Sequence, residues 1–293
     1  MTVDVVCAGP VFLDITFEGL EALPGPGEER FARDLHTTPG GAAITAVGLV
    51  RLGLSAAIVA PLGSDFAGSI VRDQLEAAGV VCAGGRWGRT PVAAVLPVGD
   101  ERAFATFEPP GRVAAGTIER LQPRAVVVPL DELELAPNDA VAYATVGQRT
   151  VDRLGRPLRA GVARVRAVLA NHDEALRLTG ATDGDAAALA LAELGETAVV
   201  TCGADGVVAA AAGEIVTVAA PRVEAKDTTG AGDLFVAAYV GADLAGLPLQ
   251  ERLRRAAVYA ALSVRTATGA RSAATLDELE RSLAELDPAI MHE

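Results

Sequence analysis

The chain has 293 residues, 51% hydrophobic and 22% charged, and its 25 basic and 38 acidic side chains give a net charge of −13. This length suits either one large α/β domain or one domain with a small appendage, and the acidic balance argues against nucleic acid or an anionic lipid surface as a partner. No window of about 18 apolar residues lacks charges and turn formers, so the sequence predicts no membrane span.

The N-terminus and the cysteines indicate the compartment. The first ten residues lack a basic region and include Asp4, so they do not form a secretory signal. Cys7, Cys82 and Cys202 are odd in number and far apart in sequence, which favours neither a disulfide framework nor a C-x-x-C metal site. A reducing cytoplasm is the simplest interpretation.

Strand and helix patterns alternate from the start of the chain. Residues 3–8 form a short β-branched run, typical of a buried strand. The small apolar residues 42–52 predict a helix, because Gly53 follows where a helix commonly ends. Residues 55–60 predict a strand and 67–78 a helix. This alternation favours a parallel sheet covered by helices.

Residues 80–111 have a different pattern. Residues 90–98 predict a strand, Gly99-Asp100 a hairpin turn and 102–107 a second strand. We place this hairpin in a small β lid outside the main sheet, built from about 12–35 and 85–111.

The alternation resumes near Val126 and continues to the last predicted helix. The predicted strands are 165–170, 197–202, 206–211 and 215–220, and the predicted helices are 173–179, 185–194, 234–244 and 253–265. We expect 285–293 to be a frayed tail. The predicted fold is a single α/β domain over 1–293, a three-layer α/β/α sandwich with a mostly parallel central sheet and a small β lid.

The segment 131–164 has no evident role. A strand is expected near Tyr143, and Arg149, Arg153 and Arg156 are expected to form a solvated helix or loop face.

The segment with the strongest chemical signal is Asp227-Thr228-Thr229-Gly230-Ala231-Gly232-Asp233, followed by an apolar helix from Leu234. Glycines at a helix start let backbone N–H groups approach an anion, and the helix dipole adds positive potential. Such a turn stabilises charge on a transferring phosphoryl group. Asp233 would then be placed to take the proton of an attacking hydroxyl. The alternative is an ordinary turn in which Asp233 is a charge at the start of its helix.

Two common phosphate-binding motifs are absent from the sequence. No G-x-x-x-x-G-K-[ST] occurs, and Phe235 stands where the third glycine of a G-x-G-x-x-G motif would be. The sequence therefore predicts neither a P-loop protein nor a dinucleotide-binding fold.

The run DTTGAGDLF over 227–235 resembles the C-terminal signature of the ribokinase-like (PfkB) carbohydrate kinase family. Four shorter segments also resemble the family and occur in the family's order. These are Gly40-Gly41 with Ala46 and Arg51-Leu52-Gly53, the G-x-D-x-x-G element at 63–68, the N-x-x-E motif at 171–174 and the T-x-G-x-x-G turn at 201–206. The resemblance extends over most of the chain.

This resemblance implies an ATP-dependent kinase that transfers the γ-phosphoryl group to a hydroxyl of a small sugar. Asp233 would be the general base, and Gly230, Ala231 and Gly232 would supply the N–H groups of an anion hole. Asp14 would bind acceptor hydroxyls, because a carboxylate accepts hydrogen bonds from two neighbouring hydroxyls.

The resemblance also implies a nucleotide and metal site. Asn171 and Glu174 would organise Mg²⁺, mostly through water. Capping and dipole compensation at a helix start are the structural alternatives for these two residues. The remaining nucleotide contacts implied are Thr201, Gly203, Gly206 and Thr229, with the helix 256–264 beside the adenine. Asp227 is the residue implied for a monovalent cation, and activation by K⁺ stays open.

The acceptor site departs from the family pattern at one position. Gly40 and Gly41 would let the backbone approach the ligand, but Ile44 stands where many sugar kinases carry a substrate-binding asparagine. An alkyl group in place of a hydrogen-bonding group should change specificity. The sequence therefore does not identify the acceptor or the hydroxyl that is phosphorylated.

Two alternatives to a sugar kinase remain. A nucleoside kinase of the same fold gains from the apolar Ile44 but loses from an aromatic content of only 4%. A catalytically silent ligand-binding relative would have no reason to keep Asp233, Asn171 and Glu174 together. Whether the chain forms a homodimer also stays open.

Overall fold

The computed structural model describes residues 2–20, 22–86, 88–98, 101–111, 113–114, 116–155, 165–265 and 269–290. Gly99, Asp100 and Arg156, which carried sequence predictions, lie outside these ranges.

The main sheet has nine strands in the order β13-β12-β11-β10-β9-β8-β1-β4-β5. Their bounds are β1 Val5–Ala8, β4 Ala56–Val59, β5 Val81–Cys82, β8 Ala125–Pro129, β9 Val141–Thr145, β10 Val165–Asn171, β11 Gly195–Thr201, β12 Val207–Ala211 and β13 Glu214–Val218. The strands from β5 to β11 pair in parallel, while β12 and β13 run antiparallel at one edge. All four residues of β1 and of β4 are buried, as expected for central strands covered on both faces.

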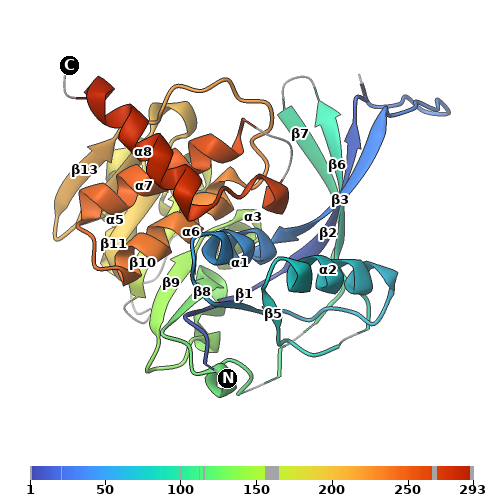
Figure 1. Ribbon diagram of the computed structural model, residues 1–293, viewed down its shortest axis with the longest axis horizontal. Coiled ribbons are helices and arrows are strands. Elements are labelled where there is room, and N and C mark those ends of the chain that lie inside the picture. The colour runs from blue at the N-terminus through green and yellow to red at the C-terminus, as the bar shows by residue number, and fades with distance from the viewer. Residues whose placement is uncertain are drawn as a thin grey trace.

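Helices cover both faces of this sheet (Figure 1). One face carries α1 Ala42–Arg51, α2 Phe66–Ala77, α6 Ala231–Leu244, α7 Leu249–Ser263 and α8 Leu276–Ile290, and the other carries α3 Gln148–Leu154, α4 His172–Thr179 and α5 Gly184–Leu191. Strand β10 shows why both faces need cover. Its Leu169 belongs to the core beneath α6 and α7, whereas its Val168 and Ala170 belong to the core beneath α4 and α5.

A second sheet of four strands, the lid, projects from the body (Figure 1). Its order is β3-β2-β6-β7, with β2 Val11–Glu18, β3 Asp34–Gly41, β6 Val92–Val98 and β7 Glu101–Phe107. Strands β2 and β6 pair in parallel, and the other two pairs are antiparallel. Strand β7 is therefore an edge strand, bonded to β6 alone.

The 63–68 element connects the lid to the body. Asp65 caps α2 by accepting from the Gly68 amide at 3.0 Å, and it also accepts from the Thr90 hydroxyl at 2.6 Å and the Thr90 amide at 2.9 Å. Thr90 lies two residues before β6. A Cβ at Gly63 would stand 2.6 Å from the Thr90 nitrogen, so only glycine fits this approach.

The structure confirms the predicted three-layer α/β/α fold with its mostly parallel sheet and small lid. Several predicted boundaries were wrong. Helix α7 begins at Leu249, four residues before the expected start at 253, and the lid strand β3 extends to Gly41, beyond the expected limit of 35. Helix α6 begins at Ala231, three residues before the expected Leu234, because Gly230 at φ +81° turns the chain directly into the helix. The expected frayed tail is helical as far as Ile290, since Leu279 and Leu283 of α8 anchor that helix in the core. None of the described helices is long and apolar enough to cross a membrane.

Candidate active site

A cavity of about 710 Å³ lies between the lid and the body. Its walls come from β2, from the start of α1, from β6 and β7, and from the turn that precedes α6. The lining residues are Phe12, Asp14, Gly41, Ile44, Ala93, Phe104, Thr106, Thr228, Thr229, Gly230 and Asp233. The turn before α6 and the first lid strand, separated by more than 200 residues in sequence, thus face the same space.

Asp233 lies in the first turn of α6, as its third residue. Its Oδ1 is 3.5 Å from the Thr45 hydroxyl, which also donates to the Asp233 carbonyl at 3.2 Å. Burial, with repulsion from Asp14 as the second cause, raises the pKa of Asp233 to about 7. A carboxylate with a pKa near neutrality can accept a proton under physiological conditions and release it again.

The glycine turn leaves helix-start amides available to a ligand. The Ala231 amide donates to the Thr228 carbonyl at 3.2 Å. In contrast, the amides of Gly230 and Gly232 have no protein acceptor among the described residues. Gly232 is exposed, and a Cβ placed there would meet nothing within 4 Å. Of the three predicted anion-hole donors, Ala231 is therefore used inside the turn, and the two glycines are free to bind an anion.

Asp14 is buried in the lid strand β2, with 8% of its surface exposed. Burial raises the pKa of its carboxyl group to about 7. Gly40 on the neighbouring strand β3, the register partner of Phe12, explains how the carboxylate fits, because a Cβ at Gly40 would stand 2.1 Å from Asp14 Oδ2. Gly40 does not itself line the cavity, but its missing side chain makes room for Asp14, which does.

Gly41 and Ile44 do line the cavity, as the sequence predicted for an acceptor site. Gly41 has φ +63°, and a Cβ there would stand 2.4 Å from the Pro10 carbonyl oxygen. Ile44 is 2% exposed and approaches Gly230, where an added Cβ would be 2.9 Å from Ile44 Cδ1. Its alkyl group therefore fills the space beside the glycine turn.

The sequence reasoning missed the lid residues that complete the cavity. Phe12 precedes Asp14 by two positions on β2, and Phe104 precedes Thr106 by two positions on β7. Residues two apart on a strand share a face. This alternation, applied to the predicted lid strands, could have identified these residues from the position of Asp14 and the hairpin register, together with Ala93, the partner of Asp14 on β6 that also lines the cavity.

Asn171 and Glu174 form a capping box at the start of α4. The Glu174 amide donates to Asn171 Oδ1 at 2.8 Å, and the Asn171 amide donates to Glu174 Oε2 at 3.4 Å. The helix cap that the sequence left open as the structural role of this pair is thus present. Burial raises the pKa of Glu174. The Asn171 side chain is exposed at the carboxyl edge of the sheet, where parallel α/β folds bind ligands.

The turn 201–206 lies beside Asn171, since Thr201 is its register partner on β11. Gly203 has φ +59° with open space where a Cβ would point. Gly206 has φ +100°, and a Cβ there would stand 2.2 Å from the Val218 carbonyl oxygen. Gly203 therefore leaves the surface open to a ligand, whereas Gly206 is needed for the close approach of β13.

Asp227 is 6% exposed and accepts from the Thr229 amide at 2.9 Å. Its own amide donates to the Val264 carbonyl at 3.2 Å, and the Gly269 amide donates to the Thr229 carbonyl at 3.2 Å. The Thr229 hydroxyl is buried without a hydrogen-bond partner among the described residues. A buried carboxylate and an unsatisfied hydroxyl in one turn are oxygen ligands of the type that a cation prefers.

A second cavity of about 540 Å³ lies between the 221–226 segment, α7 and α8. Its lining includes Val258, Ala261 and Leu262 of α7 and Arg265 just beyond the end of that helix. Three of these belong to the helix 256–264 that the sequence placed beside the adenine.

Comparisons with known proteins identify the family of the chain. The model of the pfkB family carbohydrate kinases matches residues 4–276. A 2-dehydro-3-deoxygalactonokinase of Haloferax volcanii is 36% identical over 127 residues, and this alignment covers 42% of the chain and only 40% of that relative.

Solved structures show the same fold. Arabidopsis thaliana ribokinase complexed with ribose and ATP has a TM-score of 0.79 at 23% identity, covering 97% of this chain and 99% of that one. Adenosine kinase from Sinorhizobium meliloti also has a TM-score of 0.79 at 23% identity, covering 97% of this chain and all of that one.

Proposed function

The chain belongs to the pfkB family of carbohydrate kinases, and we propose that it transfers the γ-phosphoryl group of ATP to a hydroxyl of a small sugar. One observation carries the proposal. The buried carboxyl group of Asp14 and the half-buried carboxyl group of Asp233 face one cavity, which the glycine turn at the start of α6 also lines. The cavity thus combines groups that bind a hydroxyl, accept its proton and receive a phosphoryl group.

Asp233 acts as the general base. The acceptor hydroxyl gives its proton to the Asp233 carboxylate while its oxygen forms the bond to the γ-phosphorus. The bond from that phosphorus to the bridging oxygen breaks, and ADP leaves with the electron pair. A pKa near 7 keeps enough of the carboxylate ionised to accept the proton at neutral pH.

The turn before α6 stabilises the charge of the transferring group. The free amides of Gly230 and Gly232 point from the positive end of the α6 dipole and require no reorganisation during transfer. The lid above excludes water, which would otherwise compete with the sugar as acceptor.

The nucleotide lies along the carboxyl edge of β10 and β11 in this proposal. Thr201, Gly203 and Gly206 form the turn beneath its phosphates, and the second cavity at α7 is the candidate adenine site. The exposed Asn171 and the Glu174 carboxylate beside it provide the oxygen ligands that Mg²⁺ binds through water. When bound, Mg²⁺ would neutralise phosphate charge.

Asp227 and the Thr229 hydroxyl are the candidate ligands of a monovalent cation. Their place in the turn 227–230 means that a cation there would stiffen the backbone that carries the free Gly230 amide. The buried Thr229 hydroxyl has no hydrogen-bond partner among the described residues, and its oxygen could coordinate a bound K⁺.

The cavity walls restrict the acceptor. Ile44, Phe12 and Phe104 contribute apolar surface to the cavity beside the carboxylates. That surface suits a sugar that lacks a hydroxyl at one carbon, such as the 2-dehydro-3-deoxygalactonate of the Haloferax volcanii relative's name. It also favours a nucleoside as the second candidate, because two phenylalanines could contact a base.

Phosphorylation assays over a panel test the function. ATP and Mg²⁺ would be incubated with aldoses, ketoses, deoxy sugars, 2-dehydro-3-deoxy sugar acids and nucleosides, with ADP release and product mass as readouts. We expect ADP release to require a sugar and to yield one monophosphate. Turnover with nucleosides alone would establish the second candidate. Tight acceptor binding without turnover on any compound would contradict the kinase proposal.

A further inference from the structure

We propose that Arg149 is a positioning residue that holds the edge of the lid over the acceptor cavity through Glu108. This inference rests on the proposed function, because it concerns the binding of the acceptor beneath the lid. It assigns a role to a segment that the sequence left as a solvated surface.

Glu108 lies where the lid strand β7 returns to the body. Thr106 and Phe104 of this strand line the cavity, and Glu108 continues their row by two residues. The next residues, Pro109 and Pro110, restrict the backbone. A contact that fixes the Glu108 side chain therefore also restrains the neighbouring backbone of β7, which carries the cavity-lining residues.

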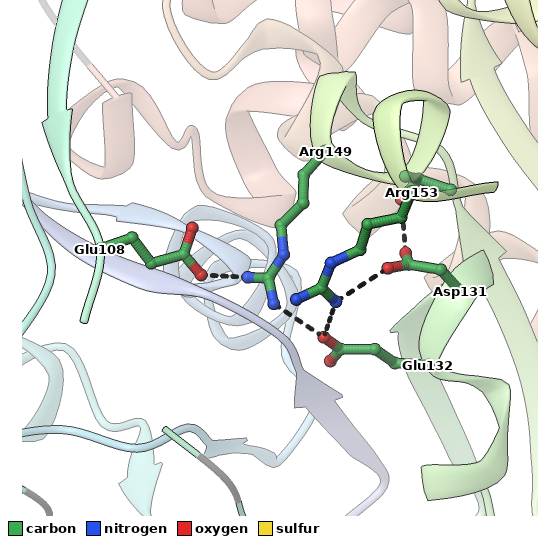
Figure 2. Close-up of polar contacts among 6 residues, drawn as sticks. Glu108, Asp131, Glu132, Arg149 and Arg153 are labelled. Atoms are coloured by element: carbon green, nitrogen blue, oxygen red, sulfur yellow. Dashed lines mark hydrogen bonds and ion pairs between the residues drawn. The ribbon is translucent and has the colours of Figure 1, made fainter. Parts of the chain in front are cut away.

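Arg149 lies on α3 in the body, four residues after β9 ends. Its Nη1 donates to Glu108 Oε1, and its Nη2 donates to Glu132 Oε1 at 3.2 Å. Figure 2 shows the guanidinium reaching from α3 toward the Glu108 strand, with Glu132 on its other side. The side chains of Arg149 and Glu108 are about one-third exposed, and that of Glu132 is 20% exposed. Glu132 thus fixes the arginine to the body while the other nitrogen binds the lid.

Because β7 is an edge strand, the ion pair between Arg149 and Glu108 is important for holding this side of the lid. The opposite edge of the lid packs on the body, where Gln74 of α2 donates to the Thr37 carbonyl at 3.3 Å. Strand β7 has no neighbour beyond β6 in the described sheet. An ion pair at its end therefore restrains the side of the lid that carries Phe104 and Thr106.

Arg153 provides a matched control on the same helix. It is one helical turn from Arg149 and binds Asp131 at 3.0 Å and Glu132 at 3.2 Å, both in the body (Figure 2). Arg153→Ala therefore removes the same kind of side chain from the same cluster without touching the lid. Alanine is a good helix former, so either substitution preserves α3.

Steady-state kinetics of Arg149→Ala, Glu108→Ala, the double variant and Arg153→Ala test the proposal. We expect each of the first two to raise the KM for the acceptor by roughly two- to fivefold, the range of a partly exposed ion pair. The double variant should show no further rise, since both changes break one contact. The turnover number at saturating acceptor and the KM for ATP should stay unchanged.

Hydrogen exchange of the acceptor-free protein gives a readout that does not depend on activity. The backbone amides of β7 should exchange faster in Arg149→Ala and Glu108→Ala than in the parent, while those of β9 should not change. An equal effect of Arg153→Ala, additive effects in the double variant, or unchanged exchange in β7 would each overturn the proposal. Because exchange needs no acceptor, a failure of the proposed kinase activity would leave this result interpretable.

Discussion

Gly40→Ala tests whether the position of Asp14 controls acceptor use. The new Cβ would stand 2.1 Å from Asp14 Oδ2 and 2.4 Å from both Cγ and Oδ1. Ordinary van der Waals contacts begin near 3.4 Å, so the carboxylate must move by roughly 1 Å or more. A misplacement of that size in a group that orients a substrate costs on the order of 100-fold in rate.

We therefore expect kcat/KM for the acceptor to fall on the order of 100-fold in Gly40→Ala, with little change in ATP binding. Gly147→Ala is the matched control, because its Cβ would meet nothing within 4 Å and its φ of −131° suits alanine. Initial-rate kinetics with the acceptor varied, together with thermal melting of each variant, provide the measurement. An unchanged kcat/KM in a folded Gly40→Ala protein would refute the placement of Asp14 in the acceptor site.

Three other predictions concern ionisation, a cation and stability. Burial raises the pKa of both Asp14 and Asp233 to about 7, and both act as carboxylates in the proposal. We therefore expect kcat/KM for the acceptor to fall as the pH drops below 7, by at least about fivefold at pH 6. A flat profile down to pH 5 would contradict this prediction. If the turn 227–230 holds a monovalent cation, K⁺ should raise the melting temperature of the parent more than that of Asp227→Asn, and an equal shift in both would count against the site. The carboxylate of Asp243 accepts a hydrogen bond from the Tyr143 hydroxyl at 2.5 Å and pairs with Arg166 and Arg252. Asp243→Asn should lower the free energy of unfolding, measured in urea, by about 3 kcal/mol. A loss below about 0.5 kcal/mol would show that the network contributes little.

The sequence was sufficient for the fold because its local patterns agree with the tertiary structure. The β-branched run at 3–8 became the buried β1, and the small apolar residues at 42–52 became α1, which packs against α6. The lid was found from the hairpin pattern at 90–107. The error at α6 arose because Gly230 and Gly232 are poor helix formers and indicate a turn, while the left-handed Gly230 in fact caps the helix and Ala231 begins it.

The site was less accessible to sequence reasoning. Ile44 was singled out correctly as a cavity residue, but its contact with Gly230 depends on how α1 meets α6. Gly40 was predicted to let the backbone approach the ligand, and the structure adds a reason for glycine that the sequence did not indicate, namely the space that Asp14 occupies. The pairing of Arg149 with Glu108 joins residues 41 positions apart across the lid and the body, and no local pattern encodes such a contact.

The central claim is that Asp233 takes the proton of the acceptor hydroxyl, and the most direct measurement compares Asp233→Asn with the parent protein. ATP binding would be measured by calorimetry, and phosphorylation of the best acceptor by single-turnover kinetics. We predict nearly unchanged ATP affinity and a rate lowered by about 100- to 10,000-fold, the usual contribution of a general base. A parent-like rate of phosphoryl transfer in Asp233→Asn would contradict the account.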